Sequence, residues 1–322
     1  MAAIASNPQR GVARRQLGRR MREHAWGYVM LLPLIVLTLT FVIYPIFGSI
    51  RYAFYNWDGF GEPEQFVGLR HFITVANDKY FWNAFQHTIT YTVVLVPVQL
   101  LLALILALVL NDPRLRFSNF YRAVYFLPVV TSAAVIGVVL GLMFARISAN
   151  FPQWMIDAKL VNPMLGIVND PRLIMPTIIA VGIWHTLGYN MVYFLAALQS
   201  VPRELYEAAT MDGAGRWAKF AHITIPMLRP IGTIITFLAI LGSLGVFDIV
   251  WVLNKGGPFY ASDVVSTYIY GYTFTSTRGG STANYGYASA AALFMSTLVL
   301  GLTALQIIVV RRANRQRNEL QA

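Results

Sequence analysis

The stretch from residue 91 to residue 110 constrains the fold of this chain most. It carries no charge, and fourteen of its twenty residues are Leu, Ile or Val. At about −0.3 to −0.6 kcal/mol for each such side chain, insertion into a bilayer gains on the order of −6 kcal/mol. That gain is large enough to tolerate Pro97 and Gln99. The stretch therefore predicts a membrane-spanning helix.

Five further apolar runs accompany this one, and the composition agrees with them. The 322 residues are 57% hydrophobic and 12% charged, outside the range of ordinary soluble domains. The first run is longer than a signal-peptide core and lacks a small-x-small cleavage site, so it predicts an uncleaved span. We predict an all-α polytopic membrane protein with six transmembrane helices, at about 26–50, 84–110, 122–144, 173–198, 231–253 and 285–310. Proline is expected to bend the first span at Pro33 and Pro45 and to kink the third at Pro128.

The basic residues predict the orientation of these spans. Seventeen of the 25 Lys and Arg fall in the N-terminal tail 1–25, the short loops after spans two and four, and the C-terminal tail 311–322, against eight in the other loops. Loops rich in Lys and Arg stay in the cytoplasm. Both termini and the loop 199–230 are therefore predicted to be cytoplasmic, on either side of a transmembrane domain spanning 26–310. The net charge of +11 is thus read as a topology signal and not as a sign of nucleic-acid binding.

The polar loop 199–230, called the coupling segment below, has the sequence of two helices joined by a sharp turn. Ser200 is expected to cap a helix from about Pro202 to Met211, which Asp212-Gly213 ends. A second helix is expected from Arg216 to Ile223, with Pro226 and Pro230 marking the exit toward the fifth span.

One face of the first of these helices is small. Leu205, Ala208 and Ala209 lie three and four residues apart, so they share a face that another backbone could approach closely. A docking surface explains this face, together with Trp217 and Phe220, better than the alternative of a solvated loop.

Motifs for chemistry are missing from the sequence. There is no Gly-x-x-x-x-Gly-Lys-Ser/Thr loop, no cysteine and no His-Glu-x-x-His, and the five histidines are scattered. No catalytic residue, metal ligand or cofactor is therefore assigned to this chain. Energy for work against a gradient must come from another subunit.

Residues of the coupling segment carry a family resemblance. Glu207-Ala208-Ala209, Gly213 and Ile223-Thr224-Ile225-Pro226 resemble the EAA loop of membrane subunits of binding-protein-dependent ABC importers. Residues 198–209 and Asp212-Gly213-Ala214 resemble the carbohydrate branch of that family, and the similarity extends from Tyr121 to Ala290. Ile225 stands where the family usually has leucine, a conservative change.

This resemblance implies a function and a set of partners. The chain would be one of two homologous permease subunits with the type I ABC importer fold, in a bacterial or archaeal plasma membrane. Two ATP-binding subunits would hold ATP and Mg, and an external solute-binding protein, such as a lipoprotein, would deliver a di- or oligosaccharide. The residues implied to couple to the ATPase are Glu207, Ala208, Ala209, Asp212, Gly213, Ile223 and Pro226. Two alternatives stay open at this point: a glycerol-phosphate or polyol importer, and a self-contained channel or secondary carrier.

Polar and small residues interrupt spans four and five, and such positions at membrane depth face a cavity or another helix. Gly188, Met191, Ser243 and Val246 match lining positions of the family's sugar site by resemblance. Tyr189, Asn190, Phe247, Asp248 and Trp251 are further candidates for the substrate pathway. The alternative for the glycines is close helix packing, for Asp248 a place near the outer interface, and for Glu207 a local ion pair with Arg203.

Overall fold

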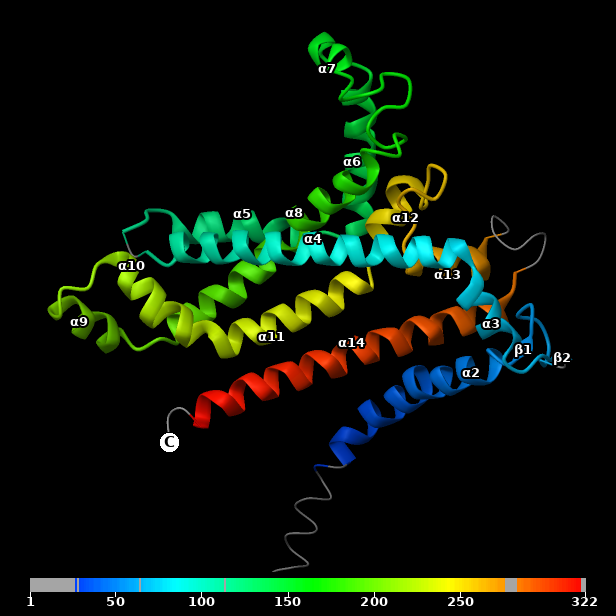
Figure 1. Ribbon diagram of the computed structural model, residues 1–322, viewed down its shortest axis with the longest axis horizontal. Helices are drawn as coiled ribbons and strands as arrows, with labels where there is room; N and C mark the ends of the chain where they lie inside the picture. The colour runs from blue at the N-terminus through cyan, green and yellow to red at the C-terminus, as the bar shows by residue number, and fades with distance from the viewer. Residues whose placement is uncertain (1–26, 28, 64, 113, 276–282, 320–322) are drawn as a thin grey trace, which may run out of the picture.

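The computed structural model describes residues 27, 29–63, 65–112, 114–275 and 283–319. These residues form helices and one two-stranded antiparallel sheet, in which Tyr55 pairs with Phe66 (Figure 1). In chain order, with η for a π-helical turn, the elements are η1 (Leu39–Ile43), α2 (Tyr44–Tyr52), β1 (Tyr55–Asn56), β2 (Gln65–Phe66), α3 (Arg70–Asn77), α4 (Lys79–Leu110), α5 (Ser118–Val130), α6 (Ala133–Ser148), α7 (Gln153–Asp157), α8 (Ile174–Gln199), α9 (Arg203–Met211), α10 (Arg216–Lys219), η2 (Phe220–Thr224), α11 (Ile225–Leu244), α12 (Asp248–Asn254), α13 (Val265–Phe274) and α14 (Tyr285–Glu319).

The predicted all-α membrane architecture is confirmed. Within the described residues, four helical segments are long and apolar enough to cross a membrane, namely Val29–Tyr52, Lys79–Leu110, Ile174–Gln199 and Arg216–Asn254. The bent pair α5 and α6 would add a fifth, and α14 contributes the shorter apolar helix Tyr285–Gly301. Each of the six predicted spans thus corresponds to helix in the structure.

The prediction of one kinked helix for the third span is wrong. The chain forms two helices, α5 and α6, whose axes differ by 95°. The break lies at Thr131 and Ser132, both with extended backbone, whereas Pro128 lies inside α5. The hydroxyl of Thr131 donates to the carbonyl of Leu127 at 3.1 Å, which satisfies an orphan acceptor at the end of α5. As a result α6 and α7 leave the bundle sideways (Figure 1).

The predicted boundaries of the fifth span are also wrong. Helix α11 begins at Ile225, not at 231, and α10 and η2 lead into it without a gap from Arg216 onward. Pro226 occupies the first turn of α11. The wide π-helical turn η2 lies just before it, and such a turn shifts the carbonyl groups that the proline ring would otherwise meet. At its other end α11 stops at Leu244, and α12 resumes only after Gly245, Val246 and Phe247.

Three other boundaries differ from the predictions. Helix α4 begins at Lys79 because the Asp78 carboxylate accepts a hydrogen bond from the backbone N–H of Tyr80 at 2.8 Å. The predicted external loop 254–284 contains the helix α13. Helix α14 continues past 310 to Glu319, into the predicted C-terminal tail. The predicted basic tail 1–25 lies outside the described residues.

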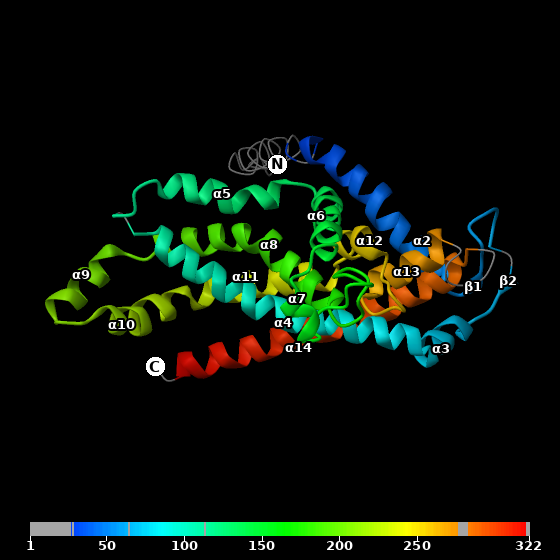
Figure 2. The ribbon, with the colours of Figure 1, turned by 90° about the horizontal axis from the view of Figure 1, so that it is seen from above.

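Helix α4 forms the centre of the bundle and packs along α8, with α11 and α13 beside it. No residue of the helical segment Val29–Tyr52 is buried, although α2 contacts α14. Helices α9 and α10 and the connection from α4 to α5 gather at one end of the bundle, while β1, β2, α3 and α13 gather at the other (Figures 1 and 2). The two connections predicted to be cytoplasmic, after spans two and four, thus lie together at one end of the bundle.

A hydrogen-bond cluster closes the end of the bundle that contains α3. The carboxylate of Asp78 accepts from the hydroxyls of Tyr268 and Tyr287, which lie 2.7 Å apart. Tyr268 is fully buried, and this burial, followed by the bond to Asp78, raises its pKa. The cluster joins the start of α4 to α13 and α14.

Candidate functional site

The coupling segment is exposed at the end of the bundle. The helix predicted from Pro202 to Met211 is present as α9, with most of its outer surface in solvent. Glu207, Ala208, Asp212 and Gly213 are exposed, whereas Ala209 is half-buried. Two large apolar side chains flank the turn and are also exposed, Met211 at 88% and Trp217 at 81%. Together they give this end of the bundle an apolar surface that a partner protein could cover.

Gly213 makes the turn between the two helices. Its φ is +78°, in the left-handed region that side chains disfavour, and its N–H donates to the carbonyl of Thr210 at 3.1 Å. The N–H of Ala214 donates to the carbonyl of Ala209 at 2.8 Å, which completes the helix end. The predicted role of Gly213 in the turn is therefore confirmed at the level of the backbone.

Two side-chain hydrogen bonds fasten α9 to the helix that follows the turn. The hydroxyls of Tyr206 and Thr224 lie 2.9 Å apart, and the ammonium of Lys219 donates to the hydroxyl of Thr210 at 2.7 Å. These pairs could not be predicted from residue types, because the partners meet only after the turn has formed. We call the two helical segments and the turn between them, Arg203–Thr224, the elbow. Ile223 and Pro226 are both half-buried and lie at its base. The elbow is therefore braced at both helices.

Two local expectations in this segment are wrong. Ser200 does not cap α9, since its hydroxyl donates back to the carbonyl of Ala197 at 2.7 Å. The helix instead begins after Pro202, whose side chain cannot accept a hydrogen bond. Among the described residues, Glu207 and Arg203 form no ion pair within 4.0 Å, and the side chain of Glu207 is exposed to solvent.

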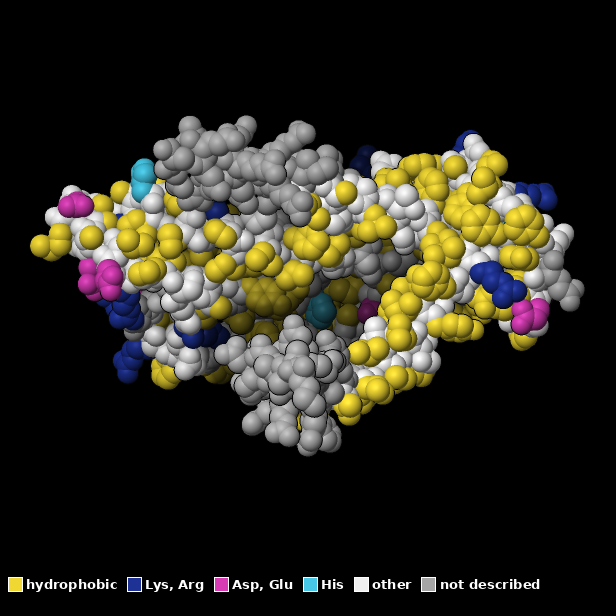
Figure 3. Space-filling view, turned by 90° about the horizontal axis from the view of Figure 1, so that it is seen from below, with side chains coloured by type: hydrophobic (Ala, Val, Ile, Leu, Met, Phe, Trp, Pro, Cys, Tyr) yellow, Lys and Arg dark blue, Asp and Glu magenta, His cyan; other side chains and the backbone are white. Residues whose placement is uncertain are grey.

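A cavity of about 230 Å³, called the central cavity below, opens between α4, α8, α11 and α12. Six of the nine predicted pathway residues line it: Tyr189, Asn190, Ser243, Val246, Phe247 and Asp248. Four further polar or aromatic residues line the central cavity and were not predicted for the pathway: Tyr91, Gln99, His185 and Thr186. The space-filling view shows a hollow in one face of the molecule, with a histidine and an acidic side chain inside it (Figure 3).

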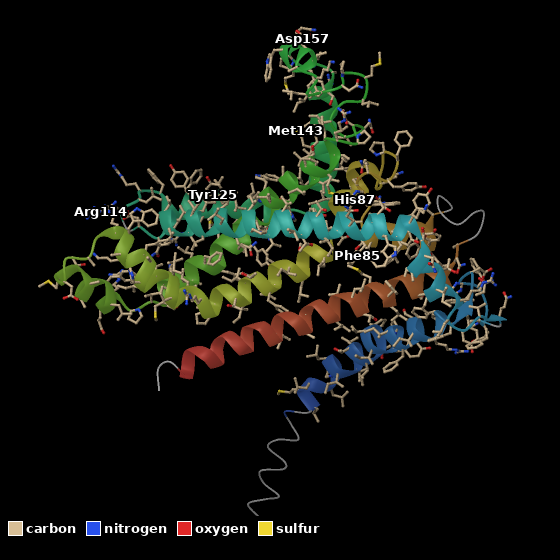
Figure 4. All side chains as sticks on the ribbon, viewed as in Figure 1. Phe85, His87, Arg114, Tyr125, Met143 and Asp157 are labelled. Carbon is tan, nitrogen blue, oxygen red and sulfur yellow. The ribbon has the colours of Figure 1, made fainter. Side chains whose placement is uncertain are left out.

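The other three predicted pathway residues lie elsewhere. A Cβ at Gly188 would stand 2.0 Å from the carbonyl oxygen of Tyr125, so this glycine lets α5 approach α8 (Figure 4). Met191 is fully buried in the core between α4, α8 and α11. Trp251 stacks on Phe247, with ring centroids 5.9 Å apart, and lies outside the central cavity.

Asn190 is a buried polar residue of the central cavity with spare hydrogen-bonding capacity. Its side chain is 1% exposed, and its amide N–H donates to the carbonyl of Thr186 at 3.2 Å. Its carbonyl oxygen has no partner among the described residues. Since a buried unsatisfied acceptor costs about 1–3 kcal/mol, this oxygen is suited to accept a hydroxyl from a ligand.

The wall formed by span five combines a fixed polar contact with irregular backbone. The hydroxyl of Ser243 donates to the carbonyl of Ile240 at 2.8 Å and lies 3.1 Å from the hydroxyl of Thr92 of α4. Gly242 has no atom within 4 Å of a built Cβ, so unlike Gly188 it borders open space. Asp248 is exposed at the first residue of α12, where the helix dipole favours a carboxylate. No group of three or more His, Asp or Glu in the described residues could hold a metal ion.

Comparisons with known proteins point to one family. The family model described as "Binding-protein-dependent transport system inner membrane component" matches residues 99–315. The chain is 34% identical to the lactose transport system permease protein of Rhizobium radiobacter, over 88% of this chain and 94% of that protein. It is 30% identical to the trehalose/maltose transport system permease protein of Thermococcus litoralis, over 91% and 96%. It is 29% identical to the sn-glycerol-3-phosphate transport system permease protein of Pectobacterium atrosepticum, over 90% and 95%.

Solved structures agree with these sequence matches. A chain of a bacterial ABC transporter involved in the import of the acidic polysaccharide alginate has a TM-score of 0.72 at 25% identity, covering 92% of this chain and 99% of that one. A chain of the bacterial alginate transporter in complex with a pentasaccharide-bound periplasmic protein has a TM-score of 0.71, also at 25% identity. The overall path of the helices is thus shared.

Proposed function

Because the chain belongs to the family of binding-protein-dependent transport system inner membrane components, we propose that it is the permease subunit of an ATP-driven sugar importer. The names of the lactose and trehalose/maltose relatives and the alginate transporter structure support a di- or oligosaccharide as the solute. We place the chain in a bacterial or archaeal plasma membrane with both termini in the cytoplasm, on the distribution of Lys and Arg.

The observation that carries this proposal is a direct connection between the central cavity and the coupling segment. Helix α8 lines the cavity and passes through a short link into α9, and the helix that starts at Arg216 runs on to the cavity wall at Ser243. Movement of the braced elbow therefore moves two walls of the cavity. This is the arrangement that alternating access driven from outside the chain requires.

We assign the exposed elbow to two ATP-binding subunits, which would hold ATP and Mg. Glu207 and Asp212 offer carboxylates to the partner surface, and Ala208 allows close approach. Ala209 supports α9 from its half-buried side, Gly213 sets the turn, and Ile223 and Pro226 anchor its base. Met211 and Trp217 supply the apolar contact that a helix lying in a groove needs.

A second permease chain and a solute-binding protein complete the proposed assembly. The central cavity, at about 230 Å³, is smaller than the roughly 300–1,000 Å³ of ordinary ligand pockets. We infer that a homologous second chain supplies the rest of the site, and the unburied helix Val29–Tyr52 offers it a surface. The structure of the alginate transporter with a periplasmic protein supports an external solute-binding partner.

The chemistry of the central cavity favours a neutral sugar over the two alternatives. The described residues that line it include no Lys or Arg, and Asp248 adds negative charge, which disfavours glycerol phosphate. Aromatic rings with hydroxyl and amide groups, as at Tyr189 and Asn190, suit sugar hydroxyls. A self-contained channel or secondary carrier leaves the exposed, braced elbow without a role.

Uptake by the assembled transporter in proteoliposomes tests this proposal. Labelled maltose, trehalose, lactose and glycerol 3-phosphate are offered with the solute-binding protein. We expect ATP-dependent uptake of a sugar, reduced about two- to tenfold by Asn190→Ala or Ser243→Ala through the loss of one hydrogen bond each.

Thr233→Ala is the matched control. Thr233 is an exposed hydroxyl on the same helix as Ser243, outside the central cavity, and it donates only to the carbonyl of Arg229. Uptake that is unchanged in Asn190→Ala and Ser243→Ala would remove the central cavity from the pathway. Uptake of glycerol 3-phosphate alone would overturn the sugar assignment.

A further inference from the structure

A second cavity, of about 640 Å³, lies at the end of the bundle that carries the coupling segment. The end of α4, the start of α5 and the link from α8 to α9 surround it. We call it the end cavity. Two arginines, Arg122 and Arg203, and one acidic residue, Asp112, are among the residues that line it.

Arg122 is a half-buried charge without a carboxylate partner among the described residues. Its Nη2 donates to the carbonyl of Leu110 at 2.8 Å, at the last residue of α4. Its Nε is buried and has no hydrogen-bond partner among the described residues, which also provide no carboxylate within 4.0 Å. Arginine stays protonated, and a buried polar atom of its guanidinium without a partner costs free energy. The guanidinium therefore lacks an anion.

Other groups around the end cavity are also suited to an anion. Arg203 is exposed, and it and Ser118 are the first residues of α9 and α5, so the positive ends of two helices border the same space. Tyr206 and Gln199 add polar side chains. Asp112 opposes an anion, but one of its oxygens already accepts from the backbone N–H of Arg114 at 2.9 Å.

The depth of the end cavity indicates which anion. Its apolar wall is made by Leu110, Leu115, Leu198 and Val201, at the point where the apolar helices α4 and α8 give way to the polar coupling segment. Basic pockets at this depth on the cytoplasmic side bind lipid head groups. Arginine forms paired hydrogen bonds with phosphate oxygens.

We propose that the end cavity binds the phosphate of an anionic phospholipid, with Arg122 as the principal ligand and Arg203 as the second. The head group contacts Tyr206, which is bonded to Thr224, so the lipid stabilises the braced position of the elbow. This site is separate from the central cavity, and its role goes beyond solute transport as proposed above.

Native mass spectrometry of the assembled transporter tests the site. The complex is released from nanodiscs of phosphatidylcholine with phosphatidylglycerol, and the bound lipid is counted as the phosphatidylglycerol fraction is varied. We expect retained phosphatidylglycerol, with apparent affinity reduced about tenfold or more by Arg122→Gln and about fivefold by Arg203→Gln. Arg203 is exposed, so its variant tests the site even if Arg122→Gln does not assemble.

The matched control is Arg116→Gln. It removes the same charge from an exposed residue of the loop between α4 and α5, outside the end cavity. Its affinity for phosphatidylglycerol should equal that of the unaltered chain. An equal loss in all three variants would mean general attraction to a charged surface and would overturn the proposal, as would equal retention of phosphatidylcholine. Displacement of the lipid by millimolar inorganic phosphate would overturn the lipid assignment in favour of a soluble phosphate compound.

Discussion

Replacing Gly188 with alanine should loosen the contact between α5 and α8. The new Cβ would stand 2.0 Å from the carbonyl oxygen of Tyr125 and 2.9 Å from the Cα of Phe126. Real Cβ atoms essentially never come within 3.0 Å of such neighbours, so the backbone of α5 must move by about 1 Å. Overpacking of this kind costs about 1–3 kcal/mol, and backbone cannot rotate away as a side chain can.

Gly242→Ala is the matched variant that isolates this cost. Both glycines lie within helices, Gly188 near the middle of α8 and Gly242 in the last turn of α11, so each variant gains up to about 1 kcal/mol of helix propensity. At Gly242, however, no atom lies within 4 Å of the added carbon. Gly188→Ala should therefore be less stable than Gly242→Ala by about 1–3 kcal/mol, the cost of the clash alone.

Thermal unfolding of the purified transporter in detergent measures this difference. At roughly 2–4 °C for each kcal/mol, Gly188→Ala should melt several degrees below Gly242→Ala. If the two variants melt together, or if Gly188→Ala is the more stable, then α5 does not approach α8 through this glycine. In that case Gly188 returns as a candidate for the solute pathway.

Three further predictions concern the two ends of the bundle. Asp78→Asn should lower the free energy of unfolding by about 1.5–3 kcal/mol, because it weakens the charge-assisted hydrogen bonds from Tyr268 and Tyr287. The control Asp157→Asn changes an exposed carboxylate and should leave the melting temperature unchanged. Equal melting temperatures of the two variants would contradict the role of the cluster. Burial lowers the pKa of His71 below 6.5, so on acidification the unfolded chain binds a proton at this residue before the folded chain does. The free energy of unfolding should therefore fall as the pH drops through 6.5, and it should fall less in His71→Gln. Identical pH profiles of stability in the two proteins would refute this. In Gly213→Pro the N–H that donates to Thr210 is lost, and proline cannot adopt the φ of +78° found at this position. ATP hydrolysis by the assembled transporter should therefore persist while solute uptake falls. Normal uptake would exclude the elbow from coupling.

The positions of the helices could be predicted because hydrophobicity alone decides which segments enter a bilayer. Fine geometry could not. At the third span the prediction relied on Pro128, but the break lies at Thr131 and Ser132, where two extended residues turn the chain. At the fifth span Pro226 looked like an exit, yet a π-helical turn lets the helix continue through it. Both outcomes depend on backbone torsions that residue types only bias.

The central cavity shows the same division. Asn190 and Ser243 were predicted to line the substrate pathway because polar residues within a span face a cavity or another helix, and both line the central cavity; that this cavity is the pathway stays a prediction. Gly188 and Gly242 carry the same signal in the sequence, but α5 covers the first and open space borders the second. The neighbour that separates them comes from another part of the chain. Sequence spacing on one helix cannot reveal it.

The uninterrupted helix from Arg216 to Leu244 has a further consequence. At 1.5 Å for each residue this helix is roughly 40 Å long, so a tilt of about 10° about its Arg216 end moves its Leu244 end by roughly 7 Å. A rigid rod works in both directions, and coupling free energy between two sites is reciprocal. Under the proposed function, a solute bound beside Ser243 would therefore also shift the orientation of the Arg216 end, and the ATP-binding partner docked there would respond to the presence of solute.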